Sequence, residues 1–328
     1  MRAPRFWFRE ASRTGLFARL LTPLSWLYAA GTARRLRQPA SIKPAVPVVC
    51  VGNINVGGTG KTPTTIALIE HFAGQAVHVV SRGYGGTLDG PLKVNERNHS
   101  AAEVGDEPLL LAAFATTWVA KDRAEGVRAA EKSGAEIILL DDGFQNPSVE
   151  KSFSIVVVDA NVGFGNGRVL PAGPLREPVS VGLNRADVVL TIGDSKAQQK
   201  FDELWANQIT TPRLKASLAP LETGIDWDGQ RVLAFAGIGH PEKFFATLRA
   251  LGASLIRAEA LSDHQPLTEA LMKRLELEAM ALDAQMVTTE KDAVRLPAAF
   301  RQKVLTLPVR MKIDDPDALS KALQIKGI

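Results

Sequence analysis

The chain has 328 residues, of which 45% are hydrophobic and 23% are charged, and its net charge is +4. This composition is that of an ordinary globular protein, which argues against long disordered stretches, and the length favours two domains over a single core. The only cysteine, Cys50, excludes a disulfide framework within the chain and argues against a cysteine-based zinc site. Because Cys50 lies in an apolar run, we expect it in a buried strand.

The positive charge is concentrated in residues 1–43. This stretch holds eight arginines and Lys43 against one acid, Glu10, so its net charge is +8 and the rest of the chain is net negative. A basic body would have indicated nucleic acid as a partner, and no nucleic acid is predicted. A basic arm indicates either a targeting segment or a contact with anionic lipid.

Aromatic and leucine side chains are interleaved with the arginines of this arm. A secretory signal needs an uninterrupted apolar stretch, which Arg19 and Pro23 break. A membrane-spanning helix needs about 20 apolar residues, more than residues 20–33 supply. The pattern favours a helix lying in the bilayer interface, and the alternative is an amphipathic helix docked on the protein. Residues 1–43 are therefore predicted to form a basic, amphipathic, membrane-associated segment.

Short β-branched runs alternate with helical stretches in residues 44–194. This alternation predicts an α/β domain whose parallel sheet is covered by helices on both faces. Its strands are expected at residues 48–51, 77–81, 117–120, 137–140, 154–159 and 188–191. Its helices are expected at residues 63–73, 107–115 and 123–133.

A second alternation begins near Arg231 and predicts a smaller α/β domain at residues 231–328. Its strands are expected at residues 232–235, 254–258, 284–288 and 304–309, and its helices at residues 241–251 and 267–282. Between the two domains, residues 195–230 are predicted to form a linker ribbon.

A glycine-rich segment, Gly57-Gly58-Thr59-Gly60-Lys61-Thr62, follows a buried strand and precedes a helix, which is the context of a phosphate loop. Glycines let backbone N–H groups approach phosphate oxygens, and the helix that follows points its positive end at them. Lys61 can reach the β- and γ-phosphates of ATP, and the Thr62 hydroxyl can bind magnesium. The strict pattern has glycine where this chain has Asn55, which we also assign to the nucleotide site. The alternative is an ordinary glycine-rich turn before a helix.

Two acids, Asp141 and Asp142, follow the apolar run at residues 137–140. An apolar strand that ends in a carboxylate is the second half of a phosphate-loop site, because one carboxylate holds the magnesium shell. Many strands also end in an ordinary Asp-Gly turn, and which of the two acids contacts the metal is left open.

Seven further segments are distinctive when they are read together with the phosphate loop. They are Ser81-Arg82-Gly83-Tyr84-Gly85-Gly86, Gly105-Asp106-Glu107-Pro108, Asp141-Asp142-Gly143-Phe144-Gln145, residues 165–178 (GNGRVLPAGPLREP), Phe235-Ala236-Gly237-Ile238-Gly239, Asp263-His264 and residues 288–294 (TTEKDAV). In this order, and over nearly the whole chain, the set resembles the tetraacyldisaccharide 4′-kinase family of lipid A synthesis.

The resemblance implies an ATP-dependent sugar–lipid kinase of lipopolysaccharide (lipid A) biosynthesis. Such an enzyme transfers the γ-phosphate of ATP, with magnesium, to the 4′-hydroxyl of a tetraacyldisaccharide 1-phosphate. The resemblance also implies a P-loop NTPase-type parallel-sheet domain, a second, smaller α/β domain, an active site in the cleft between them and an N-terminal membrane-associated helix. It places the enzyme at the cytoplasmic face of the inner membrane of a Gram-negative bacterium, as a peripheral or monotopic protein.

Residue by residue, the resemblance assigns catalysis to Asp106 and His264, as a carboxylate and the histidine that works with it. Without it, Asp106 before Glu107-Pro108 would be a helix N-cap, and His264 an ordinary surface histidine. A sugar hydroxyl needs such a base, because it is a poor nucleophile at neutral pH. Since the two residues lie in different predicted domains, we expect the pair to form only when the cleft closes.

Three further pairs match the nucleotide and magnesium positions of the family: Lys61 and Thr62 in the phosphate loop, Asp141 and Asp142 as magnesium-associated carboxylates, and Arg176 and Glu177 as a charged pair. We assign Arg176 to the nucleotide and Glu177 to the metal. Lys291 and Asp292 are left without a role, and a surface ion pair is their alternative.

A phosphate-loop ATPase switch at the membrane is the rival interpretation. Its members usually carry lysine just before the first glycine, where this chain has Val56, and this counts against it. A nucleotide-dependent scaffold without turnover is a third hypothesis, against which Asp106 and His264 argue. Acyl-chain preference, oligomeric state, depth of insertion and protein partners do not follow from the sequence.

Overall fold

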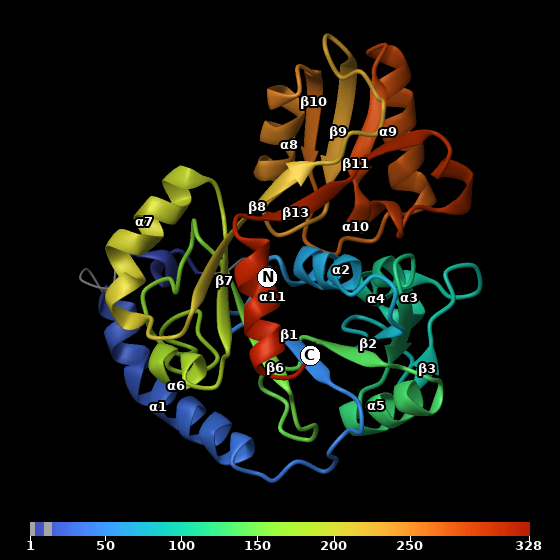
Figure 1. The fold of residues 1–328 in the computed structure, drawn as a ribbon. Coiled ribbons are helices and arrows are strands. Elements are labelled where there is room, and N and C mark those ends of the chain that lie inside the picture. Colours follow the sequence, from blue (N-terminus) through green and yellow to red (C-terminus); the bar gives the residue numbers. More distant parts are fainter. Residues whose placement is uncertain (1–3, 10–14) are drawn as a thin grey trace.

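A computed structural model of the chain describes residues 4–9 and 15–328. The chain forms two α/β units that are connected by two neighbouring strands (Figure 1). The larger unit is built on a nine-stranded sheet and the smaller unit on a four-stranded sheet. The predicted α/β class and the presence of a second, smaller unit are thereby confirmed.

The larger sheet has the strand order β13-β8-β7-β6-β1-β5-β2-β4-β3. Its strands are β1 (Val48–Gly52), β2 (Val77–Ser81), β3 (Leu92–Lys93), β4 (Thr116–Val119), β5 (Ile137–Asp141), β6 (Phe153–Asp159), β7 (Val188–Ile192), β8 (Arg213–Pro220) and β13 (Val309–Ile313). All neighbours are parallel except β13 with β8 and β3 with β4, so the sheet is mixed at both edges rather than wholly parallel.

Helices cover both faces of this sheet, which explains why every residue of the central strands β1, β2, β5, β6 and β7 is buried. Apolar side chains of α5, α6 and α7 pack on one face, and those of α2 and α11 on the other. The helices are α1 (Leu16–Leu36), α2 (Lys61–His71), α3 (Ala101–Val104), α4 (Asp106–Leu111), α5 (Arg123–Lys132), α6 (Val179–Leu183), α7 (Ser195–Trp205) and α11 (Pro316–Ile325), with 3₁₀ turns η1 (Arg5–Phe8) and η3 (Ala206–Gln208).

The smaller unit has a wholly parallel sheet in the order β10-β9-β11-β12. Its strands are β9 (Arg231–Ala236), β10 (Ser254–Ala260), β11 (Gln285–Thr289) and β12 (Val304–Leu307). Its helices are α8 (Pro241–Ala250), α9 (Glu269–Ala281) and α10 (Glu290–Ala293), with a 3₁₀ turn η4 (Ala298–Phe300). The carboxyl end of this sheet faces the larger unit, because α10, which directly follows β11, packs against α4.

The chain crosses between the units twice, and here the structure differs from the expected boundaries. β8 leads into the smaller unit, and β13 returns and pairs antiparallel with β8. Residues 309–328 were expected in the smaller domain but belong to the larger unit, where Leu319 and Leu323 of α11 enter its core. The sequence hides this return, because only Pro308 separates β12 from β13 in what reads as one apolar run. The expected linker at residues 195–230 likewise contains α7 and β8 of the larger unit.

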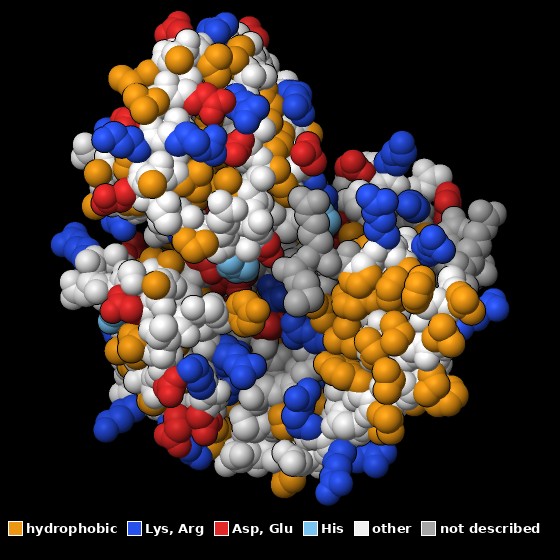
Figure 2. Space-filling model, turned by 180° about the vertical axis from the view of Figure 1, so that it is seen from behind, with side chains coloured by type: hydrophobic (Ala, Val, Ile, Leu, Met, Phe, Trp, Pro, Cys, Tyr) orange, Lys and Arg blue, Asp and Glu red, His pale blue; other side chains and the backbone are white. Residues whose placement is uncertain are grey.

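The helix α1 exposes its large apolar side chains and buries small ones. Its buried positions are Ala18, Ser25 and Thr32, spaced seven residues apart, and the Ser25 hydroxyl donates to the backbone oxygen of Val169 at 2.8 Å. The exposed large apolar residues of this segment are Phe8, Leu16, Phe17, Leu20, Leu24, Trp26, Leu27 and Tyr28. Figure 2 shows hydrophobic side chains gathered into one area on this side of the larger unit, with basic side chains around it.

This exposed apolar surface is the reverse of the pattern of a helix that only covers a core. It disfavours the alternative of an ordinary amphipathic helix docked on the protein, because the docked side is the one with small residues. Residues 1–3 and 10–14 of the predicted arm, including Arg2, Arg13 and Glu10, lie outside the described residues. In the part of the chain that the structure describes, no helix has both the length and the apolarity needed to cross a bilayer.

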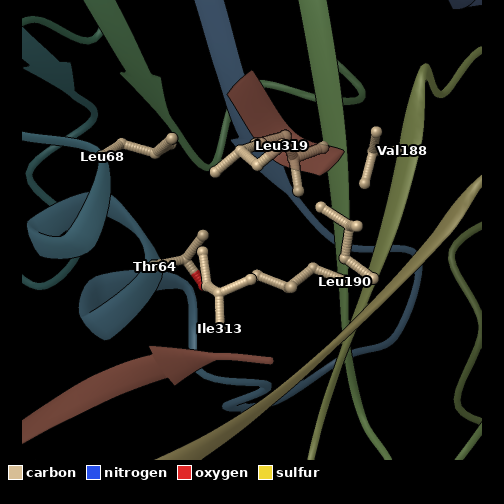
Figure 3. Close-up of a pocket in the computed structure, with 8 residues that line it drawn as sticks. Thr64, Leu68, Val188, Leu190, Ile313 and Leu319 are labelled. Carbon is tan, nitrogen blue, oxygen red and sulfur yellow. The ribbon is translucent and has the colours of Figure 1, made fainter. Parts of the chain in front are cut away.

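A cavity of about 10 Å³ lies inside the larger unit, between α2, α11 and the sheet (Figure 3). Apart from the side chain of Thr64, the groups that line it are aliphatic, among them Leu68, Leu190 and Leu319. The Thr64 hydroxyl is already used, because it donates to the backbone oxygen of Gly60 at 2.8 Å. The cavity is therefore a packing gap where the C-terminal helix covers the sheet, and not a ligand site.

Candidate active site

The phosphate loop joins β1 to α2 in the predicted position. Gly60, immediately before α2, has a φ of +95°, and a side chain there would meet the Cδ1 atom of Ile192 at 2.5 Å. Both the backbone and the space therefore require glycine at this position. Asn53, which sequence reasoning missed, supports the loop: its Nδ2 donates to the Gly57 carbonyl at 3.2 Å and to the Thr59 hydroxyl at 3.0 Å. The only signal for it is a polar residue directly after a buried strand.

The two predicted carboxylates lie beside this loop, because β5 is the parallel neighbour of β1. The Oδ1 atom of Asp142 lies 3.5 Å from Nζ of Lys61 and 3.4 Å from Nη1 of Arg176. The Oδ2 atom of Asp141 accepts a hydrogen bond of 2.9 Å from the Ser81 hydroxyl. Its Oδ1 atom is buried and has no hydrogen-bond partner among the described residues. The site thus holds one compensated and one uncompensated carboxylate.

The pKa values of Asp141 and Asp142 differ because the cations Lys61 and Arg176 lie against Asp142 and not against Asp141. Burial, together with the negative charges of Glu107 and Asp142, raises the pKa of Asp141 to about 7. Burial also acts to raise the pKa of Asp142, but the charges of Lys61 and Arg176 outweigh it and hold that pKa below its usual range. Asp141 is therefore the carboxylate whose charge needs a cation.

Within residues 4–9 and 15–328, no three His, Cys, Asp or Glu side chains form a group that could hold a metal ion by themselves. Such a site does not suit a metal that takes all its ligands from protein. It suits magnesium, which keeps several waters and usually takes one or two carboxylates together with substrate phosphates. The buried, unpartnered oxygen of Asp141 and the Thr62 hydroxyl at the start of α2 fit that donor set.

Glu177, the predicted metal ligand, has other partners in the structure. Its side chain is 2% exposed, and both of its oxygens accept from Nη2 of Arg185, at 2.6 and 2.5 Å. The guanidinium of Arg185 in turn lies over the Phe144 ring, 4.2 Å from its centroid. Glu177 thus forms an ion pair with the partly exposed Arg185, and its expected role as a metal ligand stays a prediction.

Arg176 contacts Asp142 beside the phosphate loop rather than the neighbouring Glu177. Its Nη1 lies 3.4 Å from Asp142 Oδ1 and donates to Oε1 of Gln145 at 3.2 Å. The Nε2 atom of Gln145 donates to Glu177 at 3.0 Å and to the backbone oxygen of Asn53 at 2.7 Å. Arg176 and Glu177 are therefore not paired with each other, and Gln145 connects both to the phosphate loop. Sequence reasoning missed this role of Gln145, and the available signal was its position three residues after Asp142.

Asn55 fastens the phosphate loop to the segment at residues 161–178. Its Nδ2 donates to the backbone oxygen of Gly163 at 3.0 Å, and the residue is 3% exposed. The backbone N–H of Val56 donates to Pro174 at 2.8 Å, and that of Arg176 donates to Ile54 at 2.7 Å. The side chain of Asn55 thus serves the shape of the loop, while its predicted contact with a nucleotide stays a prediction.

Asp106 and His264 meet across the two units. The Nδ1 atom of His264 lies 2.9 Å from the Oδ2 atom of Asp106, although 158 positions separate them in the sequence. Asp106 is not a helix N-cap, because α4 is capped by Gly105 and the carboxylate makes no capping hydrogen bond. The side chain of Asp106 is 5% exposed and that of His264 is 35% exposed. Figure 2 shows the hollow between the units, which acidic, basic and histidine side chains line.

The contact changes the pKa of both partners. Burial alone would raise the pKa of Asp106, but the hydrogen bond from His264 and the nearby charges, first that of Lys291, lower it below its ordinary value. The hydrogen bond to Asp106 raises the pKa of His264 above its ordinary value, against the effect of burial. An ionised carboxylate therefore orients an imidazole that titrates above 6.5.

Lys291 and Asp292, whose role the sequence left open, do not form a surface ion pair. Nζ of Lys291 lies 3.0 Å from Oε1 of Glu107, the residue after Asp106, and so adds a second ion pair between the units. Asp292 is fully buried within the smaller unit and accepts from the backbone N–H of Gly237 at 3.1 Å. The two adjacent residues thus have different partners.

Comparisons with known proteins agree over nearly the full length. A family model described as tetraacyldisaccharide-1-P 4′-kinase (LpxK) matches residues 17–326. The chain is 60% identical to a tetraacyldisaccharide 4′-kinase of Dinoroseobacter shibae, over 98% of this chain and 97% of that protein. It is 59% identical to one of Jannaschia sp., over 98% of each chain. Among solved structures, the crystal structure of LpxK from Aquifex aeolicus in complex with ATP has a TM-score of 0.76 at 26% identity, and covers 95% of this chain and 99% of that one.

Proposed function

The chain belongs to the tetraacyldisaccharide 4′-kinase family, and from that membership we propose that Asp106 and His264 together accept the proton of the 4′-hydroxyl during phosphoryl transfer. The chain is an ATP-dependent tetraacyldisaccharide 4′-kinase of lipid A biosynthesis, as the sequence resemblance implied. The observation that carries the catalytic assignment is the 2.9 Å contact between His264 and Asp106, at the junction of the two units.

The two residues have different tasks in this proposal. Nδ1 of His264 faces the buried Asp106, whereas Nε2 lies 3.7 Å from the half-exposed Asp263 without a hydrogen bond, so Nε2 is the nitrogen that can meet the acceptor. Nε2 takes the hydroxyl proton as the oxygen bonds to the γ-phosphorus and the bond from that phosphorus to ADP breaks. Asp106 holds the imidazole in the tautomer with its proton on Nδ1 and stabilises the imidazolium that forms.

The phosphate loop and its neighbours supply the charge for the transferred group. Lys61 and Arg176 would bind phosphate oxygens of ATP, and both already lie against Asp142. Asp141 and Thr62 would hold magnesium, which neutralises charge on the β- and γ-phosphates when it is bound. The Coulombic effect of Glu107 on Asp141 supports this arrangement, since Glu107 directly follows Asp106 and so lies near both sets of residues.

The substrate of this family is a lipid disaccharide phosphate, and we place the enzyme as a peripheral protein at the cytoplasmic face of the inner membrane. The exposed apolar residues of α1 and the arginines Arg19, Arg34, Arg35 and Arg37 support an interfacial position. The helix is held by the segment at residues 161–178, which also contacts the phosphate loop. The segment at residues 161–178 would thus keep the phosphate loop close to the membrane surface, where the lipid acceptor lies.

A direct test of the proposed chemistry is transfer of radiolabelled γ-phosphate from ATP to a disaccharide lipid 1-phosphate. We expect label in the lipid fraction and little release of inorganic phosphate in a reaction without acceptor. Label only in inorganic phosphate, at an equal rate with and without the lipid, would show an ATPase instead.

Membrane binding should depend on the exposed side chains of α1. Replacing Trp26 and Leu27, which are 70% and 71% exposed, by glutamate should lower binding to anionic vesicles by at least about tenfold, because each apolar side chain contributes roughly 1.5–3 kcal/mol on burial. ATP affinity should not change, and deletion of residues 1–37 should release the protein further. Vesicle co-sedimentation at two salt concentrations measures the effect, because salt screens the arginines.

The matched control is the change of Leu277 and Met280 to glutamate. These residues are 60% and 73% exposed on α9 of the smaller unit. Equal loss of vesicle binding in the control, or none in the α1 variant, would refute the assigned orientation.

The pH dependence of turnover should report His264. Its pKa is raised above 6.5 by Asp106, so kcat/KM should fall as the pH drops through that raised value and His264 becomes protonated. In Asp106→Asn the hydrogen bond to a charged partner is lost, so the midpoint of this acid limb should shift to lower pH while the plateau also falls. His71→Gln, a change at an exposed position of α2, is the control.

The folding stability contributed by His264 should change with pH in the opposite direction to turnover. Since the folded pKa of His264 is raised, the stabilisation from its ion pair with Asp106 is fully present below pH 6.5 and is lost as the pH rises through the raised pKa. Thermal melts across this range, compared with Asp106→Asn, measure the difference. For the pH–rate profile, an acid limb of kcat/KM that has the same midpoint in Asp106→Asn as in the unchanged protein would contradict the proposed role of the Asp106–His264 pair.

A further inference from the structure

A buried arginine of the smaller unit lies behind the pair of Asp106 and His264. We propose that Arg295 is a positioning residue for the kinase reaction, because its guanidinium fixes the loop that carries His264 and thereby keeps the imidazole against Asp106. This inference rests on the role proposed above for that pair. The side chain of Arg295 is 8% exposed, and its Nε lies 3.8 Å from Oδ2 of Asp106.

The guanidinium binds two backbone oxygens next to His264. Nη1 of Arg295 donates to the backbone oxygen of Gln265, the next residue, at 3.0 Å. Nη2 donates at 3.2 Å to the backbone oxygen of Gly237, the same oxygen that accepts the backbone N–H of His264 at 3.1 Å. One planar side chain therefore links Gln265, the residue after His264, to Gly237, the residue that accepts the backbone N–H of His264.

This loop needs such support. His264 has a φ of +58°, a backbone conformation that residues other than glycine adopt at a cost. Its side chain is 35% exposed, so packing alone does not fix it. Within the loop, Gln265 N–H donates to the backbone oxygen of Ser262, and the Gln265 Oε1 atom accepts from Ser262 N–H. These bonds close the turn, the backbone N–H groups of Leu261 and His264 join it to Ala236 and Gly237 at the end of β9, and Arg295 adds the side-chain bonds that hold the residue after His264.

Asp292 attaches the arginine itself. Its carboxylate is fully buried, pairs with Nη2 of Arg295, and accepts from the backbone N–H of Gly237 and, at 2.7 Å, from the Thr289 hydroxyl. A side chain at Gly237 would meet Arg295 Nη2 and Asp292 Oδ1, each at 3.1 Å, and the backbone oxygen of Ser262 at 3.2 Å. The arginine, the carboxylate and the loop are therefore packed closely around Gly237, so a side chain there would press on all three.

The remaining nitrogen of the guanidinium faces the other unit. Nε of Arg295 is buried, has no hydrogen-bond partner among the described residues, and lies 3.8 Å from Oδ2 of Asp106. The same side chain that orients His264 thus also presents positive charge to its partner. Lysine could supply the charge but not the fork, because its single ammonium cannot bind two carbonyl oxygens in fixed, coplanar directions.

The decisive variant is therefore Arg295→Lys. We expect kcat to fall about 10²-fold, as for a displacement of about 1 Å in a catalytic group, while KM for ATP stays within about twofold because the phosphate loop is untouched. Arg301→Lys is the matched control: Arg301 lies on the same stretch of chain and donates only to the backbone oxygen of Leu296. It should retain full activity and the same melting temperature.

Two readouts separate positioning from a general structural role. In a His264→Ala background, Arg295→Lys should lower kcat by less than about twofold further, because residues that act through one another are not additive. The NMR titration of His264 should also move: its pKa should fall toward 6.5 in Arg295→Lys, since a displaced loop weakens the hydrogen bond to Asp106.

An active, folded Arg295→Lys, a full multiplicative loss in the His264→Ala background, or an unchanged His264 titration would each overturn the inference. If His264→Ala were itself fully active, the proposed function would fail instead. If Arg295→Lys does not fold, Gly237→Ala tests the same point by crowding the guanidinium from the loop side. Gly237→Ala should lower kcat when His264 is present and not in the His264→Ala background. Equal losses of kcat with and without His264 would count against the proposal.

Discussion

Replacing Asp106 or His264 by alanine is expected to lower turnover by about 10²–10⁴-fold in each case, the usual contribution of a positioned general base. ATP affinity should survive both changes, because the phosphate loop lies on other elements, β1 and α2. The double variant should lose far less than the product of the two single losses, since the residues act as one unit through a 2.9 Å contact.

The structure adds a confounding effect that the experiment has to remove. Each alanine also breaks a contact between the two units, so part of a loss could come from their separation. Lys243→Ala is the matched control, because Lys243 of the smaller unit forms an ion pair of 2.7 Å with Asp159 of the larger unit. We expect it to lower turnover by no more than a few-fold, since half-exposed ion pairs contribute little.

Turnover in both single variants, the double variant and the control should be measured together with ATP affinity. Fully multiplicative losses would mean that Asp106 and His264 have independent roles. A collapse of ATP affinity in Asp106→Ala would move that residue to the magnesium site, and a loss in Lys243→Ala as large as in His264→Ala would show that union of the two units, not proton transfer, limits the rate.

The second large effect is expected at the phosphate loop. Lys61→Ala should lower turnover by about 10²–10³-fold, the typical cost of removing one preorganised charge from a transition state. In addition, Asp142 would lose the nearby cation that contributes most to holding its pKa low. The variant should therefore also bind ATP more weakly, because Asp142 would keep Arg176 but lose Lys61, and more of its negative charge would act on the phosphates.

Thr62→Ala should lower turnover by a similar factor of about 10²–10³, but with a distinct signature. The magnesium concentration that gives half of the maximal rate should rise, because a metal ligand is lost. Thr65→Ala is the control: Thr65 lies on the same helix, is fully buried, and donates to the backbone oxygen of Lys61 at 3.1 Å. It should affect the melting temperature and not the magnesium requirement.

Rates measured across a magnesium series for these three variants decide the point. Near-normal turnover in both Lys61→Ala and Thr62→Ala would remove the loop from the nucleotide site. A magnesium dependence that is the same in Thr62→Ala and Thr65→Ala would leave the nucleotide assignment intact and remove Thr62 from the metal.

Much of the architecture could be predicted from local sequence. The runs of Val, Ile and Leu at β1, β5, β6 and β7 identified central strands, because strands buried on both faces are apolar throughout. The glycines before Lys61 located the phosphate loop, because a left-handed backbone at Gly60 leaves glycine as the fitting residue. The acids after β5 fell beside that loop because neighbouring parallel strands end at the same edge of a sheet.

The remaining features depended on tertiary contacts. Nothing local distinguishes β12 from β13, so the return of the chain to the larger sheet could be found only from their pairing partners. The ion pair between Glu177 and Arg185 could likewise be found only from the structure, because no local pattern shows that the two side chains meet. Without the family resemblance Asp106 would have been a helix cap, and the structure shows instead that Gly105 is the N-cap residue of α4 and that the Asp106 carboxylate contacts His264.

The sequence by itself determined the central strands, the phosphate loop and the family, since each follows from residues that are close together in the chain or from motifs in a fixed order. Only the tertiary structure decided which charges meet. His264 and Asp106 are 158 positions apart, and Arg295 reaches the same point from a third segment. Such contacts are set by the packing of two separately folded units, and no local pattern of side chains encodes the distance between residues on different units.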